Sequence, residues 1–277
     1  MSLVRSQQRL IAIPVCTFLG ACAANPHNKR ARLAAPTFVS AVYSDTSLRL
    51  MLAVTPNAEG ACQQSVSPDH AAFDRRVAET GARLSEVAFR TYPQLADRVA
   101  AFRFSVEEKV EPATASTANG LVVVMRGASK LAPDDETLSF LLAREIGHVV
   151  AQHHEETTGT SLVVSALSTL FLPVANVAKY LGTLFSGVST PAASVSVTVA
   201  SFAGSRVLAE SYRPRQLEEA DDIAVALLQR HGIDPGSIAR HFSRVDLSTP
   251  QTRWVSELSA SVQRVAFLAA RAEAAKA

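Results

Sequence analysis

The chain has 277 residues, of which 48% are hydrophobic, and its formal net charge is +2. This length suits one large domain or two small ones, and the hydrophobic content is ample for a core. The small net charge and the lack of a long basic run argue against a nucleic-acid-binding protein.

The first 21 residues have the organisation of a secretory signal peptide. Arg5 and Arg9 precede an apolar run from Leu10 to Ala21 that is too short for a comfortable membrane span. The run ends in the motif LGAC, which resembles the bacterial lipobox, where the cysteine is diacylated and becomes the first residue of the mature protein. An ordinary signal peptide or an uncleaved anchor with an incidental cysteine is the alternative.

The lipobox interpretation predicts an exported lipoprotein that is anchored to a membrane through Cys22. Residues 22–36, with two prolines and the basic stretch HNKRAR, are typical of a tether, and residues 37–277 are then the folded domain. An alanine rather than an aspartate after Cys22 favours the periplasmic face of the outer membrane.

The first half of the domain shows signals for strands and one helix. Thr37–Tyr43 and Leu48–Val54 are rich in Val, Leu and Phe and predict a hairpin. A helix is expected from His70 to Phe89, after a capping aspartate. Phe102–Val110 alternates and Gly120–Arg126 is a short apolar run, so both are expected to be strands.

The second half of the domain is predicted to be helical. Acidic residues after Pro133 suit the positive end of a helix dipole and mark a helix start. Residues 161–207 are apolar and could be buried core helices with an irregular segment, or a lid or membrane-touching hairpin. Further helices are expected over Arg213–Arg230, over Pro235–Phe242 and from Gln251 to the C-terminus.

The helix that follows Pro133 carries the most informative motif of the chain. In an H-E-x-x-H helix, two histidines at i and i+4 bind Zn²⁺, and the glutamate acts as general base. Here the first position is Arg144, followed by Glu145 and His148. A guanidinium has no acceptor lone pair and stays charged, so it cannot ligate a metal.

A second polar group follows the motif closely. His153, His154, Glu155 and Glu156 are adjacent, and adjacent residues point to different faces of a helix. We therefore expect a solvated helix end here rather than another metal cluster.

Three separated segments together resemble the membrane-associated zinc metallopeptidases that include the CAAX prenyl proteases, HtpX and bacterial lipoproteins of outer-membrane assembly. They are the strand NGLVVVMRG, the helix LAPDDETLSFLLAREIGHVVAQHH and the helix SYRPRQLEEADDIAVALLQRHGIDP. The resemblance covers roughly residues 70–275. It implies a mainly helical α+β protein with a gluzincin-like fold and a small antiparallel edge sheet.

The resemblance assigns site residues at matching positions. The general-base position is Glu145, and the metal-ligand positions are Arg144, His148 and Leu217, of which only His148 is a ligand. Leu217 stands four residues before Asp221, which matches the family's aspartate that orients a ligand histidine.

Glu218 is the nearest substitute for the missing glutamate ligand. A one-residue shift would be needed to use it, and this turns the carboxylate by about 100° around the helix. The resemblance also implies that the strand with Gly120, Leu121, Val122, Val123 and Val124 is an edge that pairs with extended substrate.

The cation at position 144 decides the expected chemistry. Two unit charges ~4 Å apart repel by about 4 kcal/mol at an effective dielectric near 20, and a divalent ion roughly doubles this. We therefore expect no stoichiometric metal, and we expect Arg144 to pair with Glu145 or Glu218 and so hold two helices together.

The resulting prediction is a cell-envelope pseudopeptidase that binds extended or unfolded segments of envelope proteins for quality control or assembly. The alternative is an active zinc metalloendopeptidase that uses Glu218 as an unusual ligand, with Glu145 activating water. A third possibility is a structural partner of an envelope complex that uses residues 161–207.

Overall fold

The computed structural model describes residues 21–57, 68–171, 213–247 and 252–274. Residues 1–20 of the signal peptide predicted over residues 1–21, and residues 172–207 of the apolar segment, lie outside these ranges.

The described strands are β1 (Ala21–Ala24), β2 (Ala31–Ala34), β3 (Arg103–Glu107), β4 (Thr114–Ser116) and β5 (Leu121–Met125). The described helices are α2 (Thr37–Val54), α3 (Pro68–Thr91), α4 (Asp135–Val150), α5 (His153–Phe171), α8 (Pro235–Phe242), α9 (Arg253–Ala274) and a helix over residues 213–231. Two short 3-10 helices cover Pro93–Asp97 and Arg126–Leu131.

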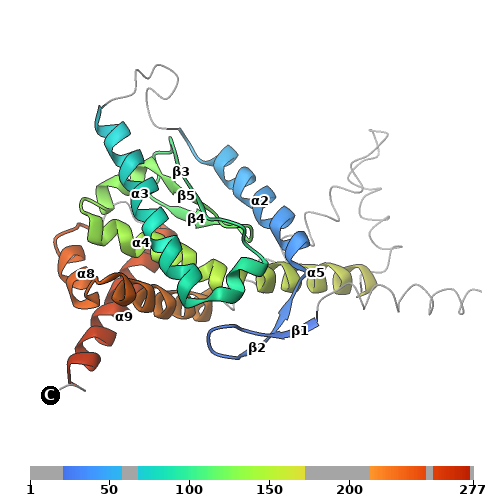
Figure 1. The fold of residues 1–277 in the computed structure, drawn as a ribbon. Helices are drawn as coiled ribbons and strands as arrows, with labels where there is room; N and C mark the ends of the chain where they lie inside the picture. The colour runs from blue at the N-terminus through green and yellow to red at the C-terminus, as the bar shows by residue number, and fades with distance from the viewer. Residues whose placement is uncertain (1–20, 58–67, 172–212, 248–251, 275–277) are drawn as a thin grey trace, which may run out of the picture.

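A three-stranded sheet lies among the helices (Figure 1). Its strand order is β3–β5–β4, in which β5 pairs parallel with β3 and antiparallel with β4. Helix α3 packs on β3 and α4 packs on β4, so β5 is buried along residues 122–125. The mainly helical α+β fold expected from the sequence is confirmed.

The position of β5 overturns the prediction that residues 120–124 form the substrate edge. Because β5 is hydrogen-bonded on both sides, its main-chain groups cannot pair with a further strand. The edge strands of the described sheet are instead β3 and β4, and the sequence did not predict β4.

Residues 37–54 form one helix, α2, and the predicted hairpin is wrong. The buried residues Ser40, Ser44 and Leu48 are spaced four apart, which is helical spacing, and their face packs against α5. Residues that favour strands, such as Phe38 and Val42, lie on the outer face, where they are 67% and 69% exposed.

The segment predicted to be a tether is folded onto the domain. Strands β1 and β2 form an antiparallel hairpin, in which Cys22 pairs with Leu33, and β2 packs on α5. Arg32 Nη1 donates to the carbonyl oxygens of Ala151 and Gln152, at 2.6 and 2.8 Å, just beyond the end of α4. The tether prediction for residues 22–36 is therefore wrong.

The remaining helices agree with the sequence analysis. Asp134 caps α4, and its side chain accepts from Thr137 N at 2.8 Å. Gly232 follows the 213–231 helix with φ +89°, the left-handed conformation that glycine adopts readily. Within the described residues, no helix combines the length and hydropathy needed to cross a membrane.

Helix α4 and the 213–231 helix are in close contact at Gly147. A Cβ atom at this position would lie 2.6 Å from the carbonyl oxygen of Ala220. The missing side chain therefore allows residues 144 and 148 of α4 to lie near residues 219 and 221 of the other helix.

We predict that Gly147→Ala destabilises the protein by about 1–3 kcal/mol because the added methyl group forces the two helices apart. Helix propensity alone would give the opposite sign, since alanine is favoured over glycine. Urea unfolding measures the change in stability. Gly236→Ala in α8 is the control, because the atoms within 3.5 Å of its new Cβ belong to side chains that can move. A neutral Gly147→Ala variant would contradict the close crossing.

Candidate functional site

Arg144 and Asp221 form a buried ion pair where α4 meets the 213–231 helix. Their side chains are 3% and 2% exposed, and Arg144 Nε lies 3.2 Å from Asp221 Oδ1. The atoms are not in hydrogen-bond geometry, and neither has another hydrogen-bond partner, so charge attraction is their main interaction. Arg144 joins the two helices as expected, but the predicted pairing with Glu145 or Glu218 is wrong.

Asp221 is the counter-charge of Arg144 at neutral pH. Burial raises the pKa of Asp221 to about 6, although the charge of Arg144 and a hydrogen bond from Ser261 act to lower it. The carboxylate is therefore ionised at pH 7 and takes up a proton below about pH 6.

Glu145, the general-base position, is held by the edge strand. Thr114 Oγ1 donates to Glu145 Oε1 at 2.7 Å, and Ser116 Oγ donates to Oε2 at 2.8 Å. The Glu145 residue is 6% exposed. Because both carboxylate oxygens accept from strand hydroxyls, Glu145 anchors β4 to α4.

His148 begins a chain of buried polar side chains. His148 Nδ1 lies 2.8 Å from His153 Nδ1, and His153 Nε2 lies 3.0 Å from Glu219 Oε2. Since a carboxylate only accepts, His153 donates through Nε2 and accepts at Nδ1, and His148 must donate through Nδ1. Of the four ring nitrogens, only Nε2 of His148 then has a lone pair that is not used in a hydrogen bond within this pair of histidines.

The imidazoles of His148 and His153 are both neutral at pH 7. Burial lowers the pKa of His148 well below its ordinary value, and the neighbouring His153 and the charge of Arg144 lower it further. Burial also lowers the pKa of His153, although the hydrogen bond to Glu219 opposes it.

Glu219 and Glu156 hold the N-terminal hairpin in place. Glu219 accepts from Asn25 at 2.6 Å, from Asn28 at 2.7 Å and from Arg30 Nε at 2.8 Å, and Arg30 forms a bidentate pair with Glu156 at 2.7 and 2.9 Å. Burial would raise the pKa of Glu219, but its hydrogen bonds outweigh burial and lower it.

The expected solvated helix end at residues 153–156 is therefore wrong. His153, Glu155 and Glu156 are each at most 3% exposed, because partners from distant segments cover them. Arg98, for example, pairs with Glu155 at 2.8 Å. The sequence did not single out Glu219, because the residues that bind it lie in the segment predicted to be a tether.

The two remaining ligand-related positions do not complete a metal site. Leu217 is half-buried and has no ligand atom. The Glu218 side chain is 59% exposed, and its carboxylate lies 4.0 Å from Arg264 Nη1. The one-residue shift therefore turns Glu218 toward solvent, as the helix rotation predicts.

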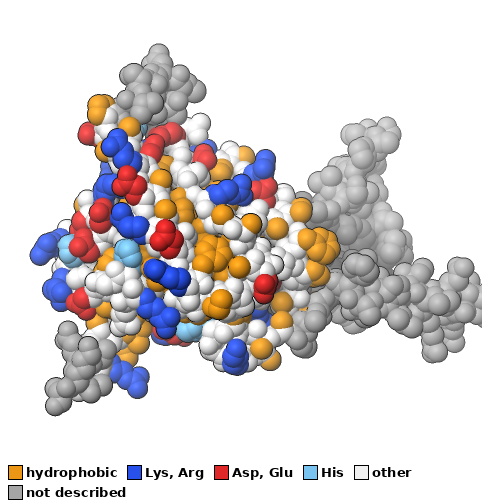
Figure 2. All heavy atoms as spheres, viewed as in Figure 1, with side chains coloured by type: hydrophobic (Ala, Val, Ile, Leu, Met, Phe, Trp, Pro, Cys, Tyr) orange, Lys and Arg blue, Asp and Glu red, His pale blue; other side chains and the backbone are white. Residues whose placement is uncertain are grey.

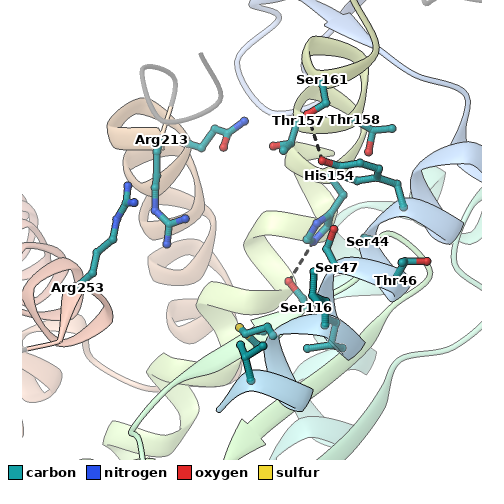
Figure 3. Close-up of a pocket in the computed structure, with 17 residues that line it drawn as sticks. Ser44, Thr46, Ser47, Ser116, His154, Thr157, Thr158, Ser161, Arg213 and Arg253 are labelled. Atoms are coloured by element: carbon teal, nitrogen blue, oxygen red, sulfur yellow. Dashed lines mark hydrogen bonds between the residues drawn. The ribbon is translucent and has the colours of Figure 1, made fainter. Parts of the chain in front are cut away.

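A cleft of about 700 Å³ lies beside β4 (Figure 3). Helix α2 forms one wall, β4 and α5 contribute Ser116 and His154, and Arg213 and Arg253 lie on the opposite side. His154 Nε2 lies 3.1 Å from Ser116 Oγ, and Tyr43 of α2 donates to Ser161 of α5 at 3.3 Å. Burial lowers the pKa of His154 to about 3, so this imidazole is neutral.

The hydrogen-bond pattern of β4 turns alternate main-chain groups toward this cleft. Thr117 N donates to Leu121 O on the β5 side at 2.9 Å, whereas Ala118 N donates the other way, to Ser44 Oγ of α2 at 3.0 Å. Since strand residues alternate in direction, the even-numbered residues of β4 direct their N–H and C=O groups away from β5. In the described chain no strand pairs with this edge.

A family model described as Peptidase family M48 matches residues 105–271, more than half of the chain. The chain belongs to peptidase family M48. Members of this family are zinc metallopeptidases, and the resemblance seen in the three sequence segments is thereby confirmed. Among curated proteins, none matches the chain significantly.

Zinc, the metal of the M48 family, does not fit the residues at this position. Arg144 offers no lone pair and already supplies the positive charge opposite Asp221, and Leu217 is aliphatic. A divalent ion beside the guanidinium would add charge repulsion. His148 alone cannot form the set of three protein ligands that catalytic zinc requires, so no hydrolytic step through zinc follows from this site.

One other group among the described residues could offer three ligand atoms to a metal. These atoms belong to Asp134, Glu136 and His241 and lie within 4.8 Å of one another. The group lies at the opposite end of α4 from His148, and Asp134 already caps that helix and bonds His241 at 2.5 Å. It is therefore unrelated to the M48 motif.

We predict that Glu219→Gln destabilises the protein at pH 7 by about 2–3 kcal/mol because charge-assisted hydrogen bonds are lost. The folded-state pKa of Glu219 is lowered, so the stability it contributes is present above its ordinary value near 4.5 and is lost as the pH falls below it. The gap between wild type and variant should therefore narrow below pH 4.5.

Urea unfolding between pH 3.5 and 7 measures this gap. Glu218→Gln is the matched control, because this neighbouring carboxylate is 59% exposed and its loss should change stability by less than about 0.5 kcal/mol. Equal effects of the two variants would contradict the buried network.

Proposed function

We propose that this M48 member is a pseudopeptidase that binds extended polypeptide segments along β4 without hydrolysing them. One observation carries the proposal. Arg144 and Leu217 stand where the family has two metal ligands, and beside them an edge strand without a partner strand among the described residues lines a cleft. The proposal implies that the protein needs no metal cofactor.

Binding at such an edge uses main-chain groups. An added strand bonds the free N–H and C=O groups of an edge, so this main-chain part of the affinity is the same for many sequences. Thr114 and Ser116 hold β4 through the Glu145 carboxylate, which keeps the edge in position before a segment binds. In this role Glu145 orders the strand instead of activating water.

We propose further that the protein is exported and anchored by lipid on Cys22, at the periplasmic face of the outer membrane. The signal-like first 21 residues and the lipobox motif support this location. Its clients would be unfolded segments of envelope proteins during quality control or assembly.

Zinc-dependent endoproteolysis is the competing function, because Glu145 and His148 of the motif are retained. The ligand set on which it depends finds no support in the geometry, since Glu218 faces solvent. The pseudopeptidase is therefore the better-supported function.

We predict that the full-length protein binds fluorescein-labelled β-casein, an unfolded polypeptide, in a saturable manner and leaves it intact. Fluorescence anisotropy measures binding and gel electrophoresis measures cleavage, with and without chelator. A synthetic strand peptide should bind at least tenfold more weakly when alternate backbone nitrogens are methylated, because those hydrogen bonds are lost. Chelator-sensitive cleavage that Glu145→Gln abolishes would establish the endopeptidase instead.

We predict that Arg144→His combined with Leu217→Glu creates a zinc site, because it supplies the two missing ligands beside His148 and Asp221. Mass spectrometry of metals should find about one zinc per chain, and zinc should raise the melting temperature. Arg144→His with Arg215→Glu is the control, since residue 215 is exposed. One zinc per chain in the unmodified protein would contradict the assignment.

A further inference from the structure

The cleft beside β4 differs in chemistry between its mouth and its floor. At the mouth, α2 presents Leu50 and Val54, which are 55% and 73% exposed. At the floor, α5 presents Thr158 and Ser161, which are at most 5% exposed. Figure 3 shows Thr158 and Ser161 on the same side of the cleft as His154 and Ser116, opposite Arg213 and Arg253.

The outer face of α2 is an apolar surface in contact with solvent. Phe38, Val42, Leu50 and Val54 are four of the six large hydrophobic residues that are most exposed in the described chain. Hydrophobic side chains are visible on the side of the molecule where α2 lies (Figure 2). Only Leu50 and Val54 of these four line the cleft.

Thr158 supplies an independent sign of a missing partner. Its residue is 0% exposed, yet Thr158 Oγ1 has no hydrogen-bond partner. A buried hydroxyl without a partner is unfavourable, and a ligand that enters the cleft can supply one.

We infer that the cleft selects extended segments in which apolar residues alternate with small polar residues. Successive side chains of a strand point in opposite directions, so a segment paired with β4 directs one set toward the floor and the other toward the mouth. The floor set meets the Thr158 hydroxyl and His154, and the mouth set packs on Leu50 and Val54. This inference rests on the proposed function and adds the side-chain pattern of the bound polypeptide.

The test compares two labelled decapeptides of the same composition by fluorescence anisotropy with the full-length protein. One alternates valine and serine, and the other has five serines followed by five valines. The alternating peptide should bind about tenfold more tightly. Binding of both with equal affinity overturns the inference but leaves the proposed function intact, whereas binding of neither removes both.

A matched pair of double variants locates the apolar contact. Leu50→Ser with Val54→Ser should weaken binding of the alternating peptide about tenfold or more, because both side chains lose apolar surface that the peptide covers. Phe38→Ser with Val42→Ser makes the same chemical change on the same helix outside the cleft and should leave the affinity unchanged. Equal losses in the two variants would overturn the inference.

Thr158→Val tests the floor with two opposite readouts. The substitution removes an unpartnered hydroxyl at nearly constant volume, so the melting temperature should stay the same or rise. Affinity for the alternating peptide should fall several-fold because its polar side chain loses a partner. Unchanged affinity would overturn the floor contact.

Discussion

The charge of Arg144, buried between two helices, is the constraint on which the rest of the site depends. The guanidinium lies where the M48 motif places its first metal ligand, and Asp221 faces it from the 213–231 helix. A buried cation needs a counter-charge and repels a second cation. The same side chain therefore repels a divalent ion at this position and joins the two helices near the Gly147 crossing.

The retained residues of the motif take part in separate structural networks. Glu145 is bonded to two hydroxyls of β4, and His148 is bonded through His153 to Glu219, which holds the N-terminal hairpin. Glu145 and His148, one turn apart on α4, thus link this helix to the strand edge and, through His153 and Glu219, to the hairpin. A catalytic arrangement would need these same groups to converge on one bound atom, whereas here they point to three different elements.

The sequence predicted the helix that begins after Pro133, the helix over residues 70–89 and the M48 family, because helix caps and residue spacing along one element are local signals. It failed where partners are distant in the chain. Strand order decides which strand is an edge, and the three-residue β4 has no periodicity to detect. In α2, β-branched and aromatic residues hid a helix whose buried positions are small or polar. Glu219 could not be identified because its hydrogen-bond partners lie in the hairpin, and the basic stretch HNKRAR of that hairpin led to the prediction of a linker.

With the lipid proposed at Cys22, the hairpin would also fix how far the domain can stand from a bilayer. A flexible linker of about 14 residues would give a reach of roughly 20 Å. In the folded chain Cys22 already belongs to β1. Arg30 and Arg32, at the start of β2, are bonded to buried acceptors of the domain. An acyl group on Cys22 would therefore be joined to the domain without a flexible linker. The domain would then rest against the lipid headgroups in one orientation. Polypeptides emerging close to that surface would meet the protein at high local concentration, while those farther away would remain out of range.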